Sequence, residues 1–262
     1  MDIISIFLKE FFTVSSKRPL NLFSPEHIIP IALMIIIIFY IRLNKQKIKI
    51  NKNKKKIIEK TFIFLFLSQQ FMLYFWYFYN GKFDLKDSLP LYLCRIITIL
   101  CIVMIIRKSF KIFEVVYFWG LGGALQALIT PDTSGCNYFS AMYIQFFVAH
   151  CGIIISIFYM MFVYDYIPNI KSLKKAINWN IIYLVFTYFF NFLVDGNYSY
   201  LRNKPLTPTI LDHFPEYPIY IPIATLGIFF IYFLLYLPFS KKQYIYESKL
   251  YESDSIEVID KI

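Results

Sequence analysis

The sequence predicts an all-α, polytopic integral membrane protein of about seven transmembrane helices. Of its 262 residues 58% are hydrophobic and 17% are charged, and the mean hydropathy is +0.54. This excess of apolar side chains is typical of membrane proteins and exceeds what a soluble domain needs. Because the connections are short, we expect one helical domain at residues 28–238, an outer segment at 1–27 and a charged cytoplasmic tail at 239–262.

Seven apolar segments approach the length of about 20 residues that a helix needs to cross a bilayer. The first begins near residue 28 and lacks a small-residue cleavage site, so we expect it to be a retained helix. The predicted segments are Ile28–Leu43, Thr61–Tyr79, Leu89–Ile106, Ile112–Ile129, Phe139–Val163, Ile177–Val194 and Ile219–Pro238.

The positive charges predict the orientation of these helices. The formal net charge is +10, and 19 of the 27 Lys and Arg residues fall in segments 42–60, 107–111, 171–175 and 241–262. Alternating helices place all four segments on one side of the membrane. The positive-inside rule therefore predicts an outer N-terminus and a cytoplasmic C-terminus. Basic segments beside a membrane contact anionic lipid head groups, so we expect membrane lipids, and not nucleic acid, to be the partners of this positive charge.

In the second and third segments, polar side chains interrupt the apolar pattern. Gln69 and Gln70 are expected to hydrogen-bond to a neighbouring helix. Pro90 is suited to the first turn of the third helix, which lacks acceptors for its N–H groups in any case. Cys94 and Arg95 then follow inside the apolar span. A charge there costs about 2.5 to 3.5 kcal/mol on insertion scales, so Arg95 is expected to be paired, to face a polar cavity or to be functional.

The fourth and fifth segments carry small residues and a histidine. Gly120 and Ala124 have the small-xxx-small spacing that permits close helix approach. Gln126 follows them, and the helix is predicted to break before Asp132. His150 is expected near the middle of the bilayer, where an imidazole brings both a donor and an acceptor into hydrocarbon.

The sixth segment ends in a polar stripe that leads into the longest outer loop. Thr187, Asn191 and Asp195 are spaced at i, i+4 and i+8, so they share one helix face. Asn197 and Asp212 lie in the loop that follows, and long ordered loops are often functional. With Cys94, Arg95 and Asp132, these residues predict a polar site that opens toward the outer side.

A thiol and an imidazole on different helices are the minimum for a cysteine nucleophile with a general base, here Cys94 and His150. Counted from the outer helix ends at about 1.5 Å per residue, their depths differ by about 8 to 10 Å. Four cysteines occur, without a CxxC pair or metal-ligand spacing. We therefore expect neither a disulfide framework nor a metal site, and no cofactor.

The order of several motifs resembles the YwaF-like (TMEM164-type) family of bacterial integral membrane proteins. The likeness extends from about Phe23 to Pro238. Its motifs are Leu89-Pro-Leu-Tyr-Leu-Cys94, Gly120-Leu-Gly-Gly-Ala124 running to Thr130-Pro-Asp132, Phe147-Val-Ala-His150, Asn191-Phe-Leu-Val-Asp195-Gly-Asn-Tyr198, and Leu211-Asp212 followed by Tyr217-Pro218.

This family is similar to eukaryotic multispanning proteins that transfer an acyl chain onto ether phospholipids through a cysteine. The resemblance implies Cys94 as the nucleophile and His150 as its partner. It also fits a location in the bacterial plasma membrane, since the excess of Ile, Lys, Asn, Phe and Tyr is typical of an AT-rich genome.

The sequence thus leads to two hypotheses. In the first, a lipid acyltransferase or acyl hydrolase, Arg95 binds phosphate and Asn191 or Gln126 stabilises the oxyanion. In the alternative, a transporter or receptor binds a small polar ligand between the helices. No inverted repeat stands out in the sequence, which favours the first hypothesis over transport.

Overall fold

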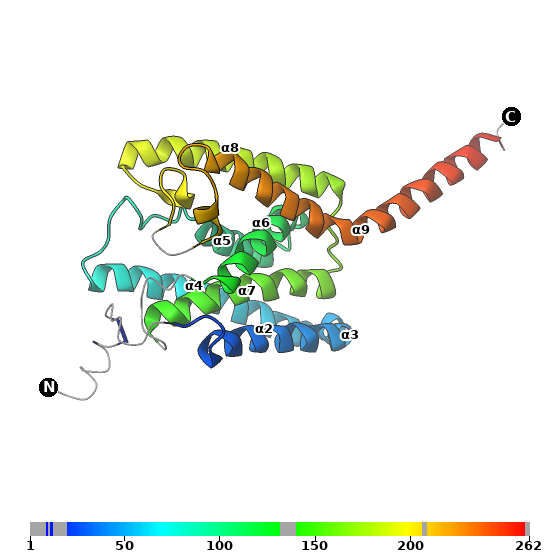
Figure 1. Cartoon of the computed structure of the whole chain (residues 1–262). Helices are drawn as coiled ribbons and strands as arrows, with labels where there is room; N and C mark the ends of the chain where they lie inside the picture. Colours follow the sequence, from blue (N-terminus) through cyan, green and yellow to red (C-terminus); the bar gives the residue numbers. More distant parts are fainter. Residues whose placement is uncertain (1–8, 10, 13–19, 132–139, 206–208, 260–262) are drawn as a thin grey trace.

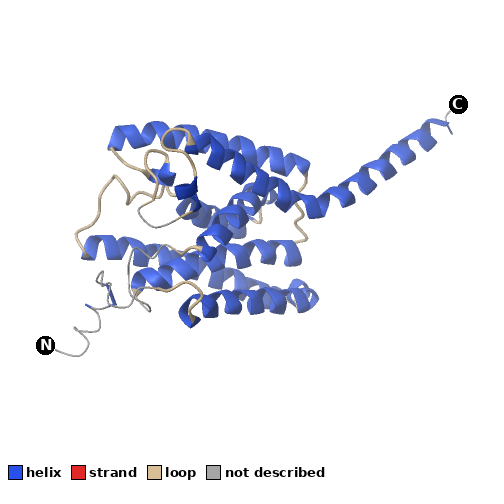
Figure 2. Ribbon diagram, in the orientation of Figure 1, coloured by secondary structure: helices blue, strands red, loops and turns tan. Residues whose placement is uncertain are grey.

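The computed structural model describes residues 9, 11–12, 20–131, 140–205 and 209–259, with only the backbone described at 241–259. These residues form a bundle of α-helices joined by loops (Figures 1 and 2). The helices are α2 (Pro25–Leu43), α3 (Lys45–Ile50), α4 (Lys52–Tyr79), α5 (Leu93–Arg107), α6 (Phe110–Ile129), α7 (Ala141–Val163), α8 (Ile170–Val194) and α9 (Tyr220–Ile259), with the 3₁₀ helices η1 (Tyr198–Tyr200) and η2 (Ile210–His213).

Within the described part of the chain, six helices are long and apolar enough to cross a membrane, namely α2, α4, α6, α7, α8 and the Tyr220–Ser240 part of α9. This confirms a polytopic helical membrane protein. The remaining predicted span, α5, has 15 residues and begins at Leu93 instead of Leu89. It still passes between the two ends of the bundle, because Arg95 at its start contacts Tyr77 late in α4, whereas Lys108 after its end pairs with Glu59 early in α4.

Helices α6 and α7 are the most buried spans and form the centre of the bundle. Glycines of α6 lie directly against neighbouring side chains. A Cβ atom on Gly120 would lie 2.7 Å from Cδ1 of Ile157 in α7, and one on Gly122 would lie 2.8 Å from Cε1 of Tyr232 in α9. The glycines of α6 therefore permit the close helix packing that the sequence predicts.

Hydrogen bonds attach the outer helices to this centre. His27 of α2 is 1% exposed; its Nδ1 accepts from the Phe23 amide, and its Nε2 lies 2.7 Å from the carbonyl oxygen of Leu128 in α6. Gln145 of α7 donates to Gln69 of α4 at 2.9 Å. This bond confirms the interhelical role predicted for Gln69, whereas Gln70 accepts from Gln69 within the same helix.

The basic segments meet at one end of the bundle. Lys49 pairs with Asp165 at 2.6 Å, and Lys108 pairs with Glu59 at 3.5 Å. Helix α9 continues beyond the predicted boundary at Pro238 to Ile259 and projects from this same end in Figure 1. The opposite end, which we call the outer end, carries the loop at 80–92 and the described residues 195–205 and 209–219.

Candidate functional site

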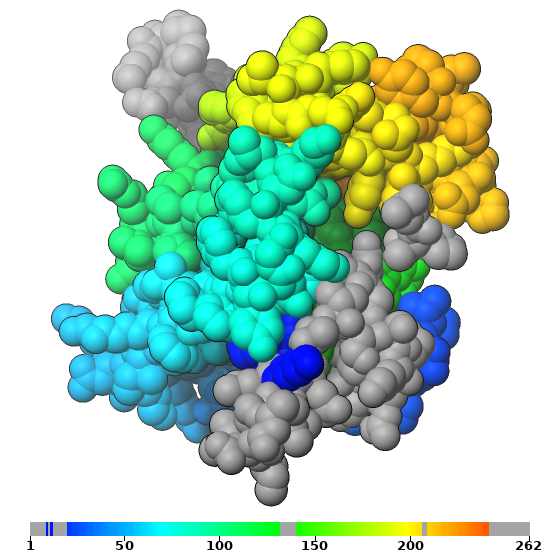
Figure 3. Space-filling view, turned by 90° about the vertical axis from the view of Figure 1, so that its left-hand side faces the viewer, coloured from blue at the N-terminus to red at the C-terminus, as the bar shows by residue number. Residues whose placement is uncertain are grey.

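Two loops from distant parts of the sequence form a cap on the outer end of the bundle. The loop at 80–92 precedes α5, and the segment at 195–203 follows α8. Figure 3 shows them side by side, in cyan and yellow. The phenol of Tyr198 donates to the carbonyl oxygen of Leu85 at 2.7 Å and accepts from the amide of Leu89 at 2.9 Å. The buried side chain of Tyr198, in the segment after α8, is thus bonded to the backbone of the loop at 80–92.

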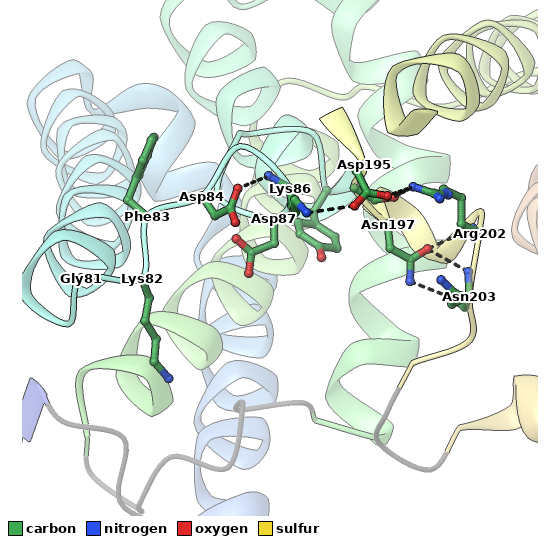
Figure 4. Close-up of a pocket in the computed structure, with 12 residues that line it drawn as sticks. Gly81, Lys82, Phe83, Asp84, Lys86, Asp87, Asp195, Asn197, Arg202 and Asn203 are labelled. Carbon is green, nitrogen blue, oxygen red and sulfur yellow. Dashed lines mark hydrogen bonds and ion pairs between the residues drawn. The ribbon is translucent and has the colours of Figure 1, made fainter. Parts of the chain in front are cut away.

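Between these loops lies a cavity of about 700 Å³ that opens to the outside (Figure 4). Its wall is rich in charged and polar side chains and is formed by both loops. The lining residues are Gly81, Lys82, Phe83, Asp84, Lys86, Asp87, Tyr92, Asp195, Gly196, Asn197, Arg202 and Asn203.

Asp195 is the centre of the charge network in this cavity. Its carboxylate pairs with Lys86 and with Arg202, each at 2.9 Å. The hydrogen bond and charge of Lys86, followed by those of Arg202, lower the pKa of Asp195, and Asp195 in turn raises the pKa of Lys86. Figure 4 shows Asp84 and Asp87 on the other side of Lys86. Among the described residues, neither of these two carboxylates forms an ion pair.

Arg95 supports the loop that leads into α5. Its NH1 group donates to the carbonyl oxygens of Asp87, Ser88 and Leu89 at 2.9 to 3.0 Å, and its NH2 group donates to the Tyr77 hydroxyl at 2.7 Å. These bonds hold the residues around the proline in a turn, which accounts for the late start of α5. They favour a role for Arg95 in shaping the site, since the guanidinium has few donors left for a phosphate.

Cys94 is the second residue of α5 and comes two residues after Tyr92, which lines the cavity. The first amides of a helix have no partner within it. Among the described residues, no backbone acceptor is bonded to the amides of Leu93 and Cys94. These amides lie at the positive end of the helix dipole and are donors without a backbone acceptor in the described structure.

His150 is 6% exposed in the middle of α7, and its Nδ1 lies 2.8 Å from the carbonyl oxygen of Phe146. A carbonyl oxygen only accepts, so Nδ1 carries the hydrogen and Nε2 has the free lone pair. Within the described part of the chain, Nε2 has no hydrogen-bond partner. This is the tautomer that a general base acting through Nε2 requires.

A contact deeper in the bundle sets the relative depth of Cys94 and His150. Ser156 of α7 lies 3.5 Å, Oγ to Sγ, from Cys101 of α5, and both helices start at the outer end. Cys94 is seven residues before Cys101, and His150 is six before Ser156. At about 1.5 Å per residue the two lie at nearly one depth. This count gives a smaller difference than the roughly 8 to 10 Å expected from the sequence, because α5 begins at Leu93 instead of Leu89.

His150 lies on the face of α7 that packs against α6. His150 shares a face of α7 with Ile153 and Ile157, which lie against Gly120 of α6. Among the described residues no hydrogen bond joins His150 to Cys94. In the described structure the predicted nucleophile and base are therefore not hydrogen-bonded to each other, although both are about equally far from the contact of Cys101 with Ser156.

Two asparagines predicted to bind substrate organise the cap. Asn191 is fully buried, and its amide group donates to the carbonyl oxygen of Tyr198 and accepts from the Tyr198 amide. Asn197 lines the cavity, but its Oδ1 accepts from the amides of Arg202 and Asn203. Both side chains are thus used to fold the segment after α8.

Two other predicted site residues, Asp212 and Gln126, are not among the residues that line the cavity. Asp212 is exposed, and its Oδ2 accepts from the Thr209 amide at 2.7 Å as a cap of η2. Gln126 is exposed on α6. Asp132 lies outside the described residues.

Several residues that build the cap were not predicted from the sequence, above all Lys86, Tyr92, Tyr198 and Arg202. Tyr198 belongs to the Asp195-Gly-Asn-Tyr motif, which was the available signal. The pairing of Lys86 with Asp195, 109 positions apart, had no such signal. Within the described part of the chain, no group of three or more His, Cys, Asp and Glu side chains is arranged to hold a metal ion.

The fold and the outer cap define a multi-pass helical membrane protein with a polar cavity at one end. Consistent with this class, a sequence model of the TMEM164 family matches residues 22–236. The chain belongs to the TMEM164 family. No curated protein and no solved structure matches it.

Proposed function

We propose that this protein acts on membrane lipids as a cysteine-dependent acyltransferase or acyl hydrolase, with Cys94 as nucleophile and His150 as general base. The observation that carries the proposal is the register of α5 and α7. Counted along the two helices from the contact of Cys101 with Ser156, Cys94 and His150 are about equally far away, and Nε2 of His150 has no partner in the described structure, which supports the pairing. A bridging water is sufficient for proton transfer between groups that do not touch.

In the proposed reaction, Sγ of Cys94 attacks the carbonyl carbon of a lipid ester while its proton passes to Nε2 of His150. The tetrahedral intermediate expels the alcohol of the lysolipid, which takes the proton from His150, and a thioester remains on Cys94. An acceptor hydroxyl, or water in hydrolysis, then gives its proton to His150 and attacks the thioester. The new ester or acid leaves, and the proton returns to the thiol.

Backbone amides are better placed than Asn191 or Gln126 to stabilise the oxyanion. The amides of Leu93 and Cys94 have no backbone acceptor within the described structure and adjoin the attacking sulfur. Asn191 is bonded to Tyr198 through both ends of its amide, and Gln126 is exposed. Preorganised donors of this kind contribute several kcal/mol to acyl transfer, about 2.7 to 4 per donor.

The orientation of the protein is part of this proposal. The basic segments 42–60 and 107–111 lie at one end, joined by the Lys108–Glu59 pair. We propose that this end is cytoplasmic and that the cap with Cys94 faces the outer side of a bacterial plasma membrane. The lipid substrate then enters from the outer leaflet.

An assay of acyl transfer from labelled phospholipid to lysolipid tests the proposal in purified, full-length protein. Cys94→Ala is expected to abolish transfer and hydrolysis with unchanged thermal unfolding, and His150→Gln is expected to slow both at least a hundredfold, about the lower limit for a general base. Cys151→Ala serves as the matched control, because it removes another buried thiol. Turnover by Cys94→Ala would contradict the mechanism.

The cavity also supports the second candidate function, the binding of a small polar ligand without chemistry. Its volume of about 700 Å³ lies within the range of small-molecule sites, about 300 to 1,000 Å³. A receptor or transporter should be stabilised by its ligand even as Cys94→Ala, and no acyl-enzyme should form.

A further inference from the structure

The outer cavity has two sides of opposite charge. On one side Lys86 and Arg202 share the single carboxylate of Asp195, so this group of three carries one net positive charge. On the other side Asp84 and Asp87 carry two negative charges. The cavity in Figure 4 thus has a basic side and an acidic side.

The acidic side keeps charge that the protein does not neutralise with an ion pair. Asp84 accepts from the Lys86 amide at 3.0 Å, and Asp87 accepts from the Ser88 hydroxyl at 2.9 Å. Lys82 is the cation that lines this part of the cavity, and its ammonium lies 5.5 Å from the centre of the Trp76 ring. Counting Lys82, the residues that line the acidic side carry one net negative charge. Arg95, which donates to the carbonyl oxygen of Asp87, is not one of these lining residues.

The cavity also offers a hydroxyl group for a ligand. Tyr92 lines it, and among the described residues its hydroxyl has no hydrogen-bond partner. The ring of Tyr92 is held edge-on against Tyr198 and under the Arg95 guanidinium, at centroid distances of 5.2 and 4.8 Å. A fixed donor therefore lies in the cavity wall, two residues before Cys94 in the sequence.

We propose that this cavity binds a zwitterionic phosphodiester, with the phosphate toward Lys86 and Arg202 and the ammonium group toward Asp84 and Asp87. The net charges of +1 and −1 on the two sides match those of such a ligand. Purely anionic ligands leave the acidic side unpaired, which disfavours them. This inference deepens the proposed function and rests on it for the source of the ligand. We propose that the ligand is the head group of the lipid whose ester reaches Cys94. In a phospholipid the esters lie on the hydrocarbon side of the phosphate, so a head group bound in the cavity leaves the esters on the side of the bundle.

Binding of soluble head groups to the full-length Cys94→Ser protein, in an uncharged maltoside detergent, tests this inference without acyl chemistry. The probes are glycerophosphocholine, which carries both charges, glycerophosphoglycerol, which lacks the cation, and inorganic phosphate. We expect calorimetric binding of glycerophosphocholine to exceed that of the other two by about tenfold. Lipid nanodiscs of phosphatidylcholine, which should compete with the soluble probe, distinguish a lipid head group from a free metabolite as its source.

Two charge variants locate the sides of the site. Asp87→Asn keeps an oxygen acceptor for Ser88 and should weaken glycerophosphocholine about three- to tenfold while leaving glycerophosphoglycerol unchanged. Lys86→Met should weaken both. Glu216→Gln, an exposed carboxylate of the outer loop outside the cavity, and Lys111→Met, on the opposite end, are the matched controls.

The outcomes separate this inference from the proposed function. Equal binding of all three probes, or no effect of Asp87→Asn on glycerophosphocholine, would overturn the zwitterionic site. Acyl transfer by wild-type protein without any head-group binding would overturn it as well and leave the function standing. Selective binding without an acyl-enzyme would support the site and reject the enzyme.

Discussion

The hydroxyl of Tyr198 is bonded to the carbonyl oxygen of Leu85, 113 positions earlier in the chain, at 2.7 Å. The same hydroxyl accepts from the Leu89 amide. The loop before α5 has no regular secondary structure, and the two hydrogen bonds of the Tyr198 hydroxyl fix its backbone instead. Because Cys94 follows this loop, the rigidity of the cap determines the position of the thiol.

Removal of this hydroxyl is expected to loosen the loop. Tyr198→Phe leaves the Leu85 carbonyl and the Leu89 amide without their partner, at a cost of about 1 to 3 kcal/mol. Thermal unfolding should report the loss of stability, and maleimide labelling of Cys94 should become faster. Unchanged stability and labelling would mean that the cap does not depend on Tyr198.

Gly196 is expected to tolerate no side chain. A Cβ atom there would lie 2.7 Å from the backbone oxygen of Lys86. Gly196→Ala should therefore force the two loops apart and destabilise the protein by about 1 to 3 kcal/mol. The control is Gly227→Ala in α9, where no atom lies within 4 Å of the added Cβ. That substitution should be neutral or stabilising by up to about 1 kcal/mol, and equal effects would contradict the prediction.

Substitution of Asn191 tests whether this residue has a structural or a catalytic role. Since both ends of its amide are bonded to the backbone of Tyr198, Asn191→Ala should lower stability by about 1 to 3 kcal/mol. A residue that binds only the oxyanion would lower turnover and leave unfolding unchanged. Measuring both quantities on one preparation decides between the two roles.

The pairing of Lys86 with Asp195 predicts a pH dependence. Lys86 and Arg202 lower the pKa of Asp195 below its ordinary value of 3.8. The ionised Asp195 therefore contributes its full stabilisation above pH 3.8, and this contribution is lost as the pH falls through the lower pKa of the folded protein. The melting temperature of wild type should thus fall more steeply than that of Asp195→Asn between about pH 5 and about pH 3. Parallel curves would show that the pair adds no stability.

The long apolar segments could be predicted from the sequence, since length and hydropathy are local properties. Six predicted spans are confirmed, although α4 begins at Lys52 and α8 at Ile170, earlier than the apolar runs. The start of α5 was misjudged. Pro90 suits a first helical turn, but Arg95 draws the preceding carbonyl oxygens into a loop, an effect of tertiary structure that local propensity does not contain.

The candidate site was predictable only in part. Asp195 and Asn197 were identified from their polar loop and do line the cavity. Their partner Lys86, and the bonds that commit Asn191 to Tyr198, depend on which loops meet in space. The depth of Cys94 likewise follows from packing, because it is set by the contact of Cys101 with Ser156 on another helix.

Intact mass spectrometry of the full-length protein after incubation with phospholipid tests the central claim most directly. Wild type should gain a mass equal to one acyl chain, which maps to Cys94, is removed by hydroxylamine, is absent in Cys94→Ser and forms more slowly in His150→Ala. Absence of any adduct at all times, with rapid alkylation proving that Cys94 is accessible, would contradict the covalent mechanism and favour the ligand-binding function.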